Sequence, residues 1–174
     1  MRCNSAGHVT IIQLGGCNLQ GTIATNSTGH SIFSLPELKE FHAEAAGEGA
    51  LCTTRKGIGG KLPADLKNAV HLQVLGLYCN VMTGSLAALE SLAQLVKIDV
   101  HFNDFVGLLP SLIKSKASLL YLSVANNKLT GPISADFAMM SKMTTFGVAF
   151  NQFTGPVYKI ITALPQLTVS ALCA

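Results

Sequence analysis

Three side chains in the middle of the chain are of the types that together perform acyl transfer. Asp99 and His101 alternate along one short stretch, and Ser123 holds the position of Asp99 in the next repeated unit. A Ser-His-Asp triad also needs a strained nucleophile and an oxyanion hole with unpaired amides. A regular ladder of parallel strands uses its amides in hydrogen bonds. The sequence therefore predicts no catalytic residue and a protein that is not an enzyme.

Metal and cofactor chemistry has equally little support. The cysteines stand at irregular spacings and form no Cys-x-x-Cys pair of the kind that zinc and thioredoxin-like sites show. His42 and His101 fall in different repeated units without a third ligand beside them. We therefore expect neither a metal nor a cofactor. The five cysteines are Cys3, Cys17, Cys52, Cys79 and Cys173.

These residues lie within an internal repeat that determines the fold. Segments beginning at Leu95, Leu119 and Met143 share the pattern apolar-x-x-apolar-x-apolar-x-x-Asn-x-apolar-x-Gly-x-apolar, and the step between them is 24 residues. The apolar-x-apolar part predicts a short strand with alternating faces. The asparagine follows the strand, where its amide can bond to the backbone of adjacent turns. The asparagines of this expected ladder are Asn80, Asn103, Asn127 and Asn151.

One such unit cannot bury its apolar edge alone, so the units are expected to stack into a solenoid. The segment from Asn127 to Ile133 resembles the 24-residue leucine-rich repeat of plant receptor ectodomains and some protist surface proteins, and the segment from Asn151 to Val157 is similar. The resemblance implies an α/β-type solenoid, a right-handed superhelix with one concave parallel sheet. Its convex side would be irregular or built from short helices.

The expected domain organisation has two parts. Residues 9–174 form about six full repeats and a partial seventh, with an insertion around residues 24–56. In the second repeat, a strand at Phe41 and Ala43 is preferred; the alternative is a strand at residues 51–53 after a helix over residues 35–46. Residues 1–8 resemble the end of an N-terminal cap, which implies that Cys3 pairs outside this segment. Cys17, at a ladder position, and Cys79 are expected to stay reduced or buried.

The repeat phase also predicts a binding surface. Side chains that point away from the core should form a patch of aromatic and mixed-charge residues on the concave face, and grouped exposed aromatics are typical of binding. The expected ligand is a protein or a peptide. The candidate residues are Tyr78, Lys97, Asp99, His101, Phe102, Tyr121, Asn126 and Phe150.

Composition narrows the class of protein further. The net charge of +3 is spread without basic clusters, so nucleic acid is not an expected partner. No apolar run reaches the length of a membrane span, and residues 1–13 contain no apolar signal region. Asn26 begins the only Asn-x-Ser/Thr sequon and is a candidate for glycosylation; the alternative is a polar loop that matches by chance.

Together these features favour a non-catalytic recognition module, secreted or on the cell surface as part of a receptor-like protein. The alternative is a scaffolding subunit that docks onto other chains through its solenoid ends, in which case association would use the uncapped C-terminal edge after Leu167. An intracellular location is the alternative to the extracellular one.

Overall fold

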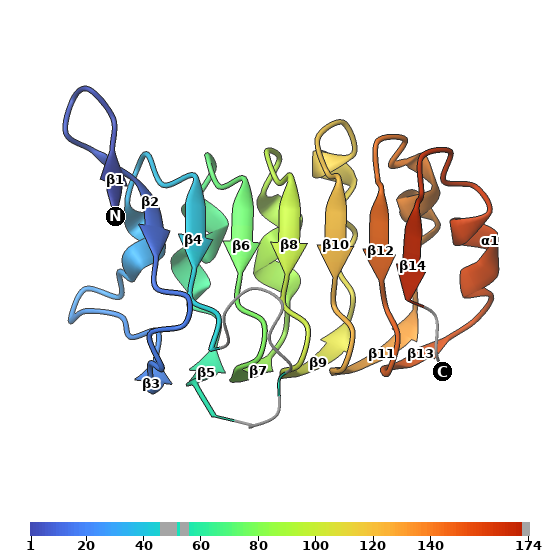
Figure 1. The fold of residues 1–174 in the computed structure, drawn as a ribbon, viewed down its shortest axis with the longest axis horizontal. Helices are drawn as coiled ribbons and strands as arrows, with labels where there is room; N and C mark the ends of the chain where they lie inside the picture. Colours follow the sequence, from blue (N-terminus) through green and yellow to red (C-terminus); the bar gives the residue numbers. More distant parts are fainter. Residues whose placement is uncertain (46–51, 53–55, 172–174) are drawn as a thin grey trace.

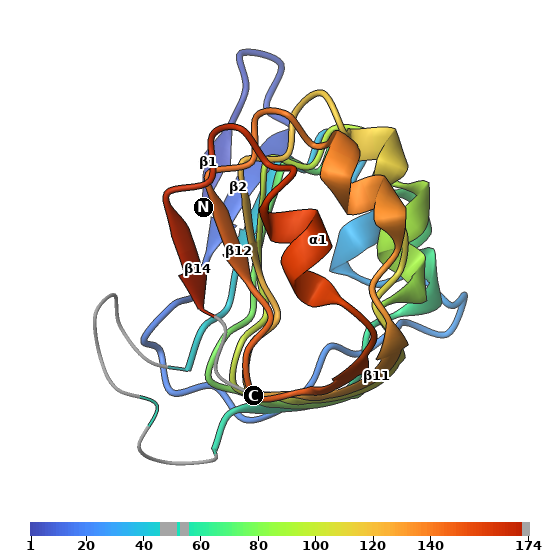
Figure 2. The same cartoon turned by 90° about the vertical axis from the view of Figure 1, so that its right-hand side faces the viewer.

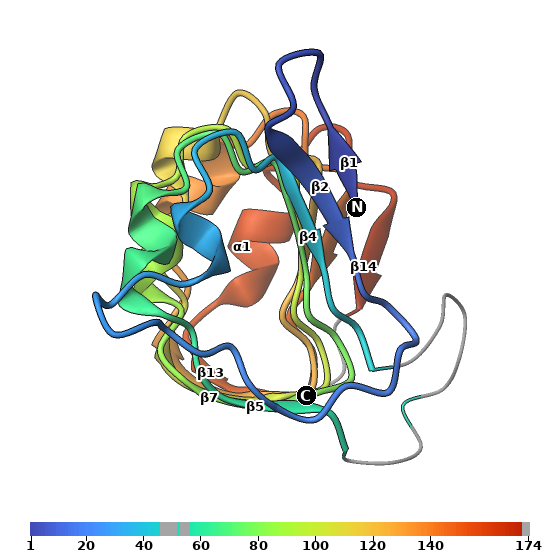
Figure 3. The same ribbon diagram turned by 90° about the vertical axis from the view of Figure 1, so that its left-hand side faces the viewer.

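The computed structural model describes residues 1–45, 52 and 56–171, which wind into one solenoid of stacked turns (Figure 1). The end-on views show a large sheet, a small sheet and a row of short helices on three sides of a shared interior (Figures 2 and 3). This is the solenoid that the repeats predict, of the α/β type that the resemblance to leucine-rich repeats implies.

The large sheet has eight strands in the order β1-β2-β4-β6-β8-β10-β12-β14. Strand β1 pairs with β2 in the antiparallel sense, and every later neighbour is parallel because each turn travels in the same direction. The strands are β1 (Arg2–Cys3), β2 (Val9–Gln13), β4 (Glu40–His42), β6 (Val74–Gly76), β8 (Lys97–Asp99), β10 (Tyr121–Ser123), β12 (Thr145–Gly147) and β14 (Val169–Ala171).

A second, small sheet was not expected from the sequence, which predicted one sheet only. The segment after each ladder asparagine is extended and bonds to its equivalent in the next turn, so that six strands line up in the order β13-β11-β9-β7-β5-β3. Gly131 takes a φ of 74° at its place in β11, a conformation suited to glycine. The strands are β3 (Gly21–Thr22), β5 (Ile58–Lys61), β7 (Val81–Gly84), β9 (Asp104–Leu108), β11 (Lys128–Pro132) and β13 (Gln152–Thr154).

Short helices form the side opposite the large sheet, as the resemblance implied. Five are single 3-10 segments, and the last is a short α-helix. Leu66, Leu89 and Phe137 point inward from these helices and are buried. The helices are η1 (Ile32–Ser34), η2 (Ala64–Asn68), η3 (Ala87–Ser91), η4 (Ile113–Ser115), η5 (Ala135–Met139) and α1 (Val157–Ile161).

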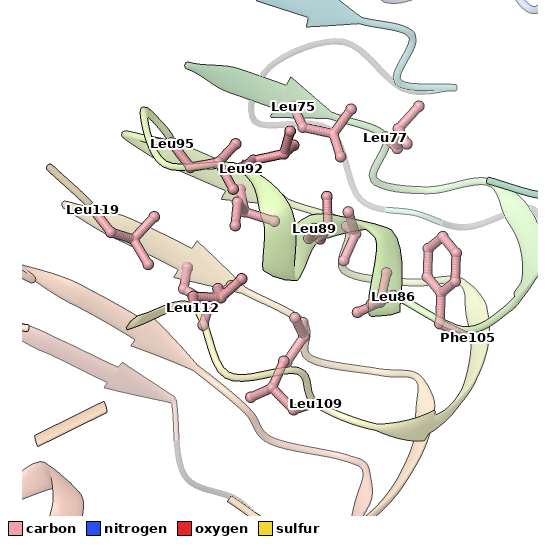
Figure 4. Close-up of a cluster of buried hydrophobic side chains, with 14 of the residues drawn as sticks. Leu75, Leu77, Leu86, Leu89, Leu92, Leu95, Phe105, Leu109, Leu112 and Leu119 are labelled. Atoms are coloured by element: carbon pink, nitrogen blue, oxygen red, sulfur yellow. The ribbon is translucent and has the colours of Figure 1, made fainter. Parts of the chain in front are cut away.

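The core is a continuous column of aliphatic and phenylalanine side chains from all three sides (Figure 4). Leu75 and Leu77 enter it from the large-sheet side, Phe105 from the small sheet, and Leu86 and Leu89 from the helical side. Because every turn supplies the same positions, each core layer rests on the layers of its two neighbours.

The second repeat follows the preferred of its two predicted paths. Strand β4 lies between β2 and β6, with Phe41 opposite Ile12 on one side and Leu75 on the other. The ring of Phe41 packs edge-on against that of Phe33, with 5.1 Å between centroids. Residues 35–45 contain no helix, so the alternative with a helix there is wrong. Its strand at residues 51–53 lies largely outside the described residues.

The ladder asparagines join successive turns through the backbone. The Asn127 amide nitrogen donates to the carbonyls of Val100, one turn earlier, and Val124, both at 3.0 Å. Its Oδ1 accepts from the Phe105 backbone N–H at 3.0 Å. Asn80, Asn103 and Asn151 repeat this arrangement in their own turns.

Replacing Asn127 with Ala tests the role of this ladder in stability. The change leaves the buried Phe105 N–H without its partner and removes one of the two asparagine amides that donate to each of the Val100 and Val124 carbonyls. The free energy of unfolding should fall by about 1–3 kcal/mol. Chemical denaturation measures the difference. Asn68→Ala is the control, because Asn68 lies exposed in η2, and a loss as large there would contradict the assignment.

Candidate functional site

The outer face of the large sheet presents its side chains in straight rows across the strands. One row contains Val74, Lys97, Tyr121 and Thr145, which are directly opposite one another in register. The next contains His42, Gly76, Asp99, Ser123 and Gly147. The second row is less bulky than the first, because Gly76, Ser123 and Gly147 are small, and we call this second row the trench.

An aromatic pair borders this trench. The rings of Tyr78 and His101 stack with 4.8 Å between centroids and 9° between planes. The His101 Nδ1 donates to the Asp99 carboxylate at 2.5 Å, so this ring nitrogen must carry a proton. Asp99 is only 4% exposed. A buried carboxylate therefore fixes the orientation of His101 within a half-buried aromatic pair.

Tyr121 and Lys97 lie on the other border. The Lys97 ammonium lies 5.0 Å from the centroid of the Tyr121 ring, within reach of a cation–π interaction. Burial raises the pKa of Tyr121 to about 12, and the charge of Asp99 adds to the effect. Tyr121 therefore keeps its proton at physiological pH, and its hydroxyl is hydrogen-bonded with Asp99 and Ser123.

A second charged cluster, not predicted from the sequence, lies on β4 at the N-terminal end of the same face. The ring of His42 lies 3.2 Å from a carboxylate oxygen of both Glu40 and Glu44. The Glu44 carboxylate covers Gly76, where a Cβ atom would overlap with it. The alternation Glu-x-His-x-Glu in the preferred strand of the second repeat could have indicated this cluster. The predicted binding patch began at Tyr78 and so did not include it.

The hydrogen bond with Glu44 raises the pKa of His42 above its usual 6.5, burial lowers it, and Glu40 raises it, with a net upward shift. The pairing of His42 with the two glutamates therefore contributes fully to stability below the pKa of His42 in the unfolded state. This contribution is lost as the pH rises through the pKa of His42 in the folded state. His42→Gln should cost more unfolding free energy near pH 5.5 than near pH 8.5. Denaturation at both pH values measures this, and an equal cost would contradict the pairing.

Phe102, Asn126 and Phe150 lie at the corner between the two sheets rather than on the strand face. Each directly precedes a ladder asparagine and has a positive φ, 51°, 55° and 54° respectively. Asparagine tolerates this left-handed conformation, whereas a bulky residue there costs about 1 kcal/mol or more. The two phenylalanines are nevertheless 42% and 56% exposed, so burial does not offset this cost.

A groove of about 290 Å³ runs along this corner. Phe102 and Phe150 line it together with Asn126, and ladder asparagines form part of its lining. Lys128 and Asp104 lie in its wall from the small sheet and form an ion pair at 2.8 Å. The ring of His101 contacts that of Phe102 with 5.8 Å between centroids, so the groove continues the aromatic border of the trench.

The Cys52–Cys79 disulfide lies at the groove. Cys79 is buried, which is one of the two states expected of it, but it is oxidised and not reduced. The Cα atoms of the two residues are 5.3 Å apart. The sequence did not reveal this pair, because Cys52 falls where the repeat phase lapses. Cys17 is free, which matches the expectation of a reduced or buried thiol, although it is exposed, as is the free Cys3. Cys173 lies outside the described residues.

The two bonded sulfurs and a ring nitrogen of His101 lie within 4.8 Å of one another. A Cys₂His set of this kind could ligate zinc only as thiolates. Because the sulfurs are bonded to each other here, neither offers a thiolate, and the two cysteines form part of the groove lining.

The disulfide should stabilise the fold, because it ties Cys52, in the insertion, to Cys79, 27 residues along the chain. Replacing both with Ser should lower the free energy of unfolding by about 2–4 kcal/mol. Thermal or chemical denaturation measures the loss. The control is the Cys3→Ser, Cys17→Ser pair, which removes only exposed free thiols. Alkylation of Cys79 in the unreduced, folded protein would contradict the bond.

Asn26 lies in an exposed turn, consistent with an accessible sequon. Its Oδ1 accepts from the backbone N–H groups of Thr28 and His30, at 3.0 and 2.9 Å, and from the Thr28 hydroxyl at 2.7 Å. The sequon hydroxyl therefore already contacts the amide that would carry a glycan. Glycosylation of Asn26 remains a prediction.

Known proteins match both the repeat and the fold. The Leucine Rich Repeat family model matches residues 118–140. Over 118 residues the chain is 31% identical to Receptor-like protein 41 of Arabidopsis thaliana, which covers 61% of this chain and 13% of that protein. The stacked turns, their asparagine ladder and these matches define a repeat solenoid. These matches support a leucine-rich repeat family for this chain.

Solved structures agree with this fold. The receptor kinase HAESA of Arabidopsis, in complex with the peptide hormone IDA and the co-receptor SERK1, superposes with a TM-score of 0.75 at 26% identity, covering 91% of this chain and 24% of that one. The ectodomain of GASSHO1/SCHENGEN3 from Arabidopsis thaliana, in complex with CASPARIAN STRIP INTEGRITY FACTOR 2, gives 0.81 at 24% identity, covering 97% and 19%. The chain thus spans about an eighth of the curated relative and about a quarter or less of these receptors. Among the described residues, no helix has the length and apolarity needed to cross a bilayer.

Proposed function

We propose that this protein is a non-catalytic module that recognises an extended peptide on the outer face of its large sheet, as part of a secreted or cell-surface receptor-like protein. The observation that carries the proposal is the stacked Tyr78–His101 pair held by buried Asp99 beside a trench of small residues. An aromatic surface whose orientation is already fixed loses little conformational entropy on binding.

The face fits a peptide better than other classes of ligand. Its charge is mixed, with Glu40, Glu44 and Asp99 near Lys97, so it lacks the basic stripe that nucleic acid requires. On β10 and β12 the small residues Ser123 and Gly147 favour close approach of a peptide backbone, whereas at Gly76 the Glu44 carboxylate covers the strand. The ectodomain of HAESA, which shares the fold, was solved with a peptide hormone, and this likeness supports the same class of ligand here.

The Asp99–His101 pair does not by itself supply catalysis. Ser123 lies opposite Asp99 on the next strand, but the amides around it are used in the ladder: the Val124 N–H donates to the Gly147 carbonyl and the Val100 N–H to the Ser123 carbonyl. An oxyanion hole needs unpaired donors. This supports recognition in place of acyl transfer.

Selection of a phage-displayed peptide library on the folded protein, followed by calorimetry with the selected peptide, tests the proposal. The Tyr78→Ala, Tyr121→Ala double variant removes a ring from each border of the trench and should weaken binding at least tenfold, since aromatic anchors each contribute more than about 1 kcal/mol. Tyr158→Ala is the control, because Tyr158 is 63% exposed on α1, away from this face. Failure to select any peptide, or equal affinity in both variants, would contradict the proposal.

A further inference from the structure

We propose that the groove at the corner of the two sheets is a specificity pocket for one large apolar side chain of the ligand. Phe102 and Phe150 form its walls, and the Asn126 amide holds the ligand backbone between them. This inference rests on the proposed peptide recognition and names the feature of the peptide that the site selects.

The first argument is the choice of residue at a strained position. The same left-handed place before the ladder asparagine is occupied by Phe102, Asn126 and Phe150 in three successive turns. Asn126 is the residue type that this conformation favours, whereas phenylalanine is disfavoured there. Both rings are also substantially exposed to water. Neither backbone preference nor core packing explains a phenylalanine at these two positions. Contact with a ligand would explain it.

The second argument is the spacing of the three side chains. Backbone hydrogen bonds connect their turns directly: the Phe102 N–H donates to the Ala125 carbonyl, and the Asn126 N–H donates to the Ala149 carbonyl. Adjacent strands lie about 4.8 Å apart, so the two phenylalanine backbones are separated by roughly 10 Å with Asn126 midway. A gap of that size admits one side chain of a ligand between the rings.

The third argument is the scarcity of free polar groups in the groove. Asn103 and Asn127 use their amides on the backbone, and Lys128 and Asp104 are paired with each other. Within the part of the chain that the structure describes, the Asn126 side chain makes no hydrogen bond. A sugar would need several convergent donors and acceptors. One free amide between two rings suits a peptide unit that carries an apolar side chain.

The groove also lies where the peptide can reach it. The contact of His101 with Phe102 joins it to the Tyr78–His101 border of the trench. At this same end of the column of corner residues, Cys79 and its disulfide to Cys52 close the groove next to Phe102. A peptide lying along the trench would therefore place one side chain into the corner.

The decisive variant is Phe102→Asn combined with Phe150→Asn, which installs at both positions the residue that the intervening turn already has. The peptide selected on the wild-type protein should bind at least tenfold more weakly to it, while the melting temperature stays the same or rises because the strained rings are gone. Tyr158→Asn, which removes an exposed ring elsewhere, should leave binding unchanged. The pocket is overturned if the Phe102→Asn, Phe150→Asn variant binds the peptide as tightly as the wild type. If the Tyr78→Ala, Tyr121→Ala variant still binds weakly in that case, the proposed function stands.

A ligand-independent readout uses capped amino acids on the wild-type protein. N-acetyl-phenylalaninamide and N-acetyl-leucinamide should shift the NMR signals of the Asn126 side-chain amide and the Phe102 and Phe150 rings, with dissociation constants on the order of 1 mM for such small molecules. N-acetyl-alaninamide should not, because its methyl group cannot span the gap. Cellobiose serves as the sugar control. Equal shifts with the alanine compound or with cellobiose would overturn the inference, and so would the absence of shifts with every compound. This test does not depend on the selection of a peptide.

Discussion

The asparagine ladder is the interaction on which the rest of this structure depends. Each turn leaves the large sheet and must enter the small one inside a protein interior, where unpaired backbone groups are costly. Asn103 meets this need for its turn by donating to the Leu77 and Val100 carbonyls and accepting from the Met82 N–H. One side chain thereby fixes the end of one strand, the start of another and the distance to the preceding turn.

The candidate binding surfaces follow from that constraint. Because the ladder holds the turns in register, side chains of equivalent positions form rows on the large sheet and a column at the corner. The chain reaches each ladder asparagine through a residue with positive φ, and that residue is turned away from the core. At two of these corners the residue is phenylalanine with a substantially exposed ring, whereas Cys79 at the equivalent place is buried.

The sequence predicted the parts that recur with the repeat period. Leu75, Ile98, Leu122 and Phe146 are buried where their phase placed them, and β4 follows the preferred phase of the second repeat. Features set by contacts between distant segments were not predictable in this way. The small sheet forms because short extended segments such as Lys128–Pro132 meet across turns, and Cys52 finds Cys79 from a stretch without repeat phase. Phe102 and Phe150 were expected on the strand face because alternation was extended past the strand end, where the left-handed residue breaks it.

The central claim is that the trench on the large sheet and the groove at the corner form one continuous peptide site. Mapping the NMR signals of the labelled protein as a selected peptide is added tests it most directly. The account predicts that the rings of Tyr78 and His101 shift together with those of Phe102 and Phe150 at one stoichiometry. Shifts confined to the small sheet or to the helices η2–η5 would contradict it.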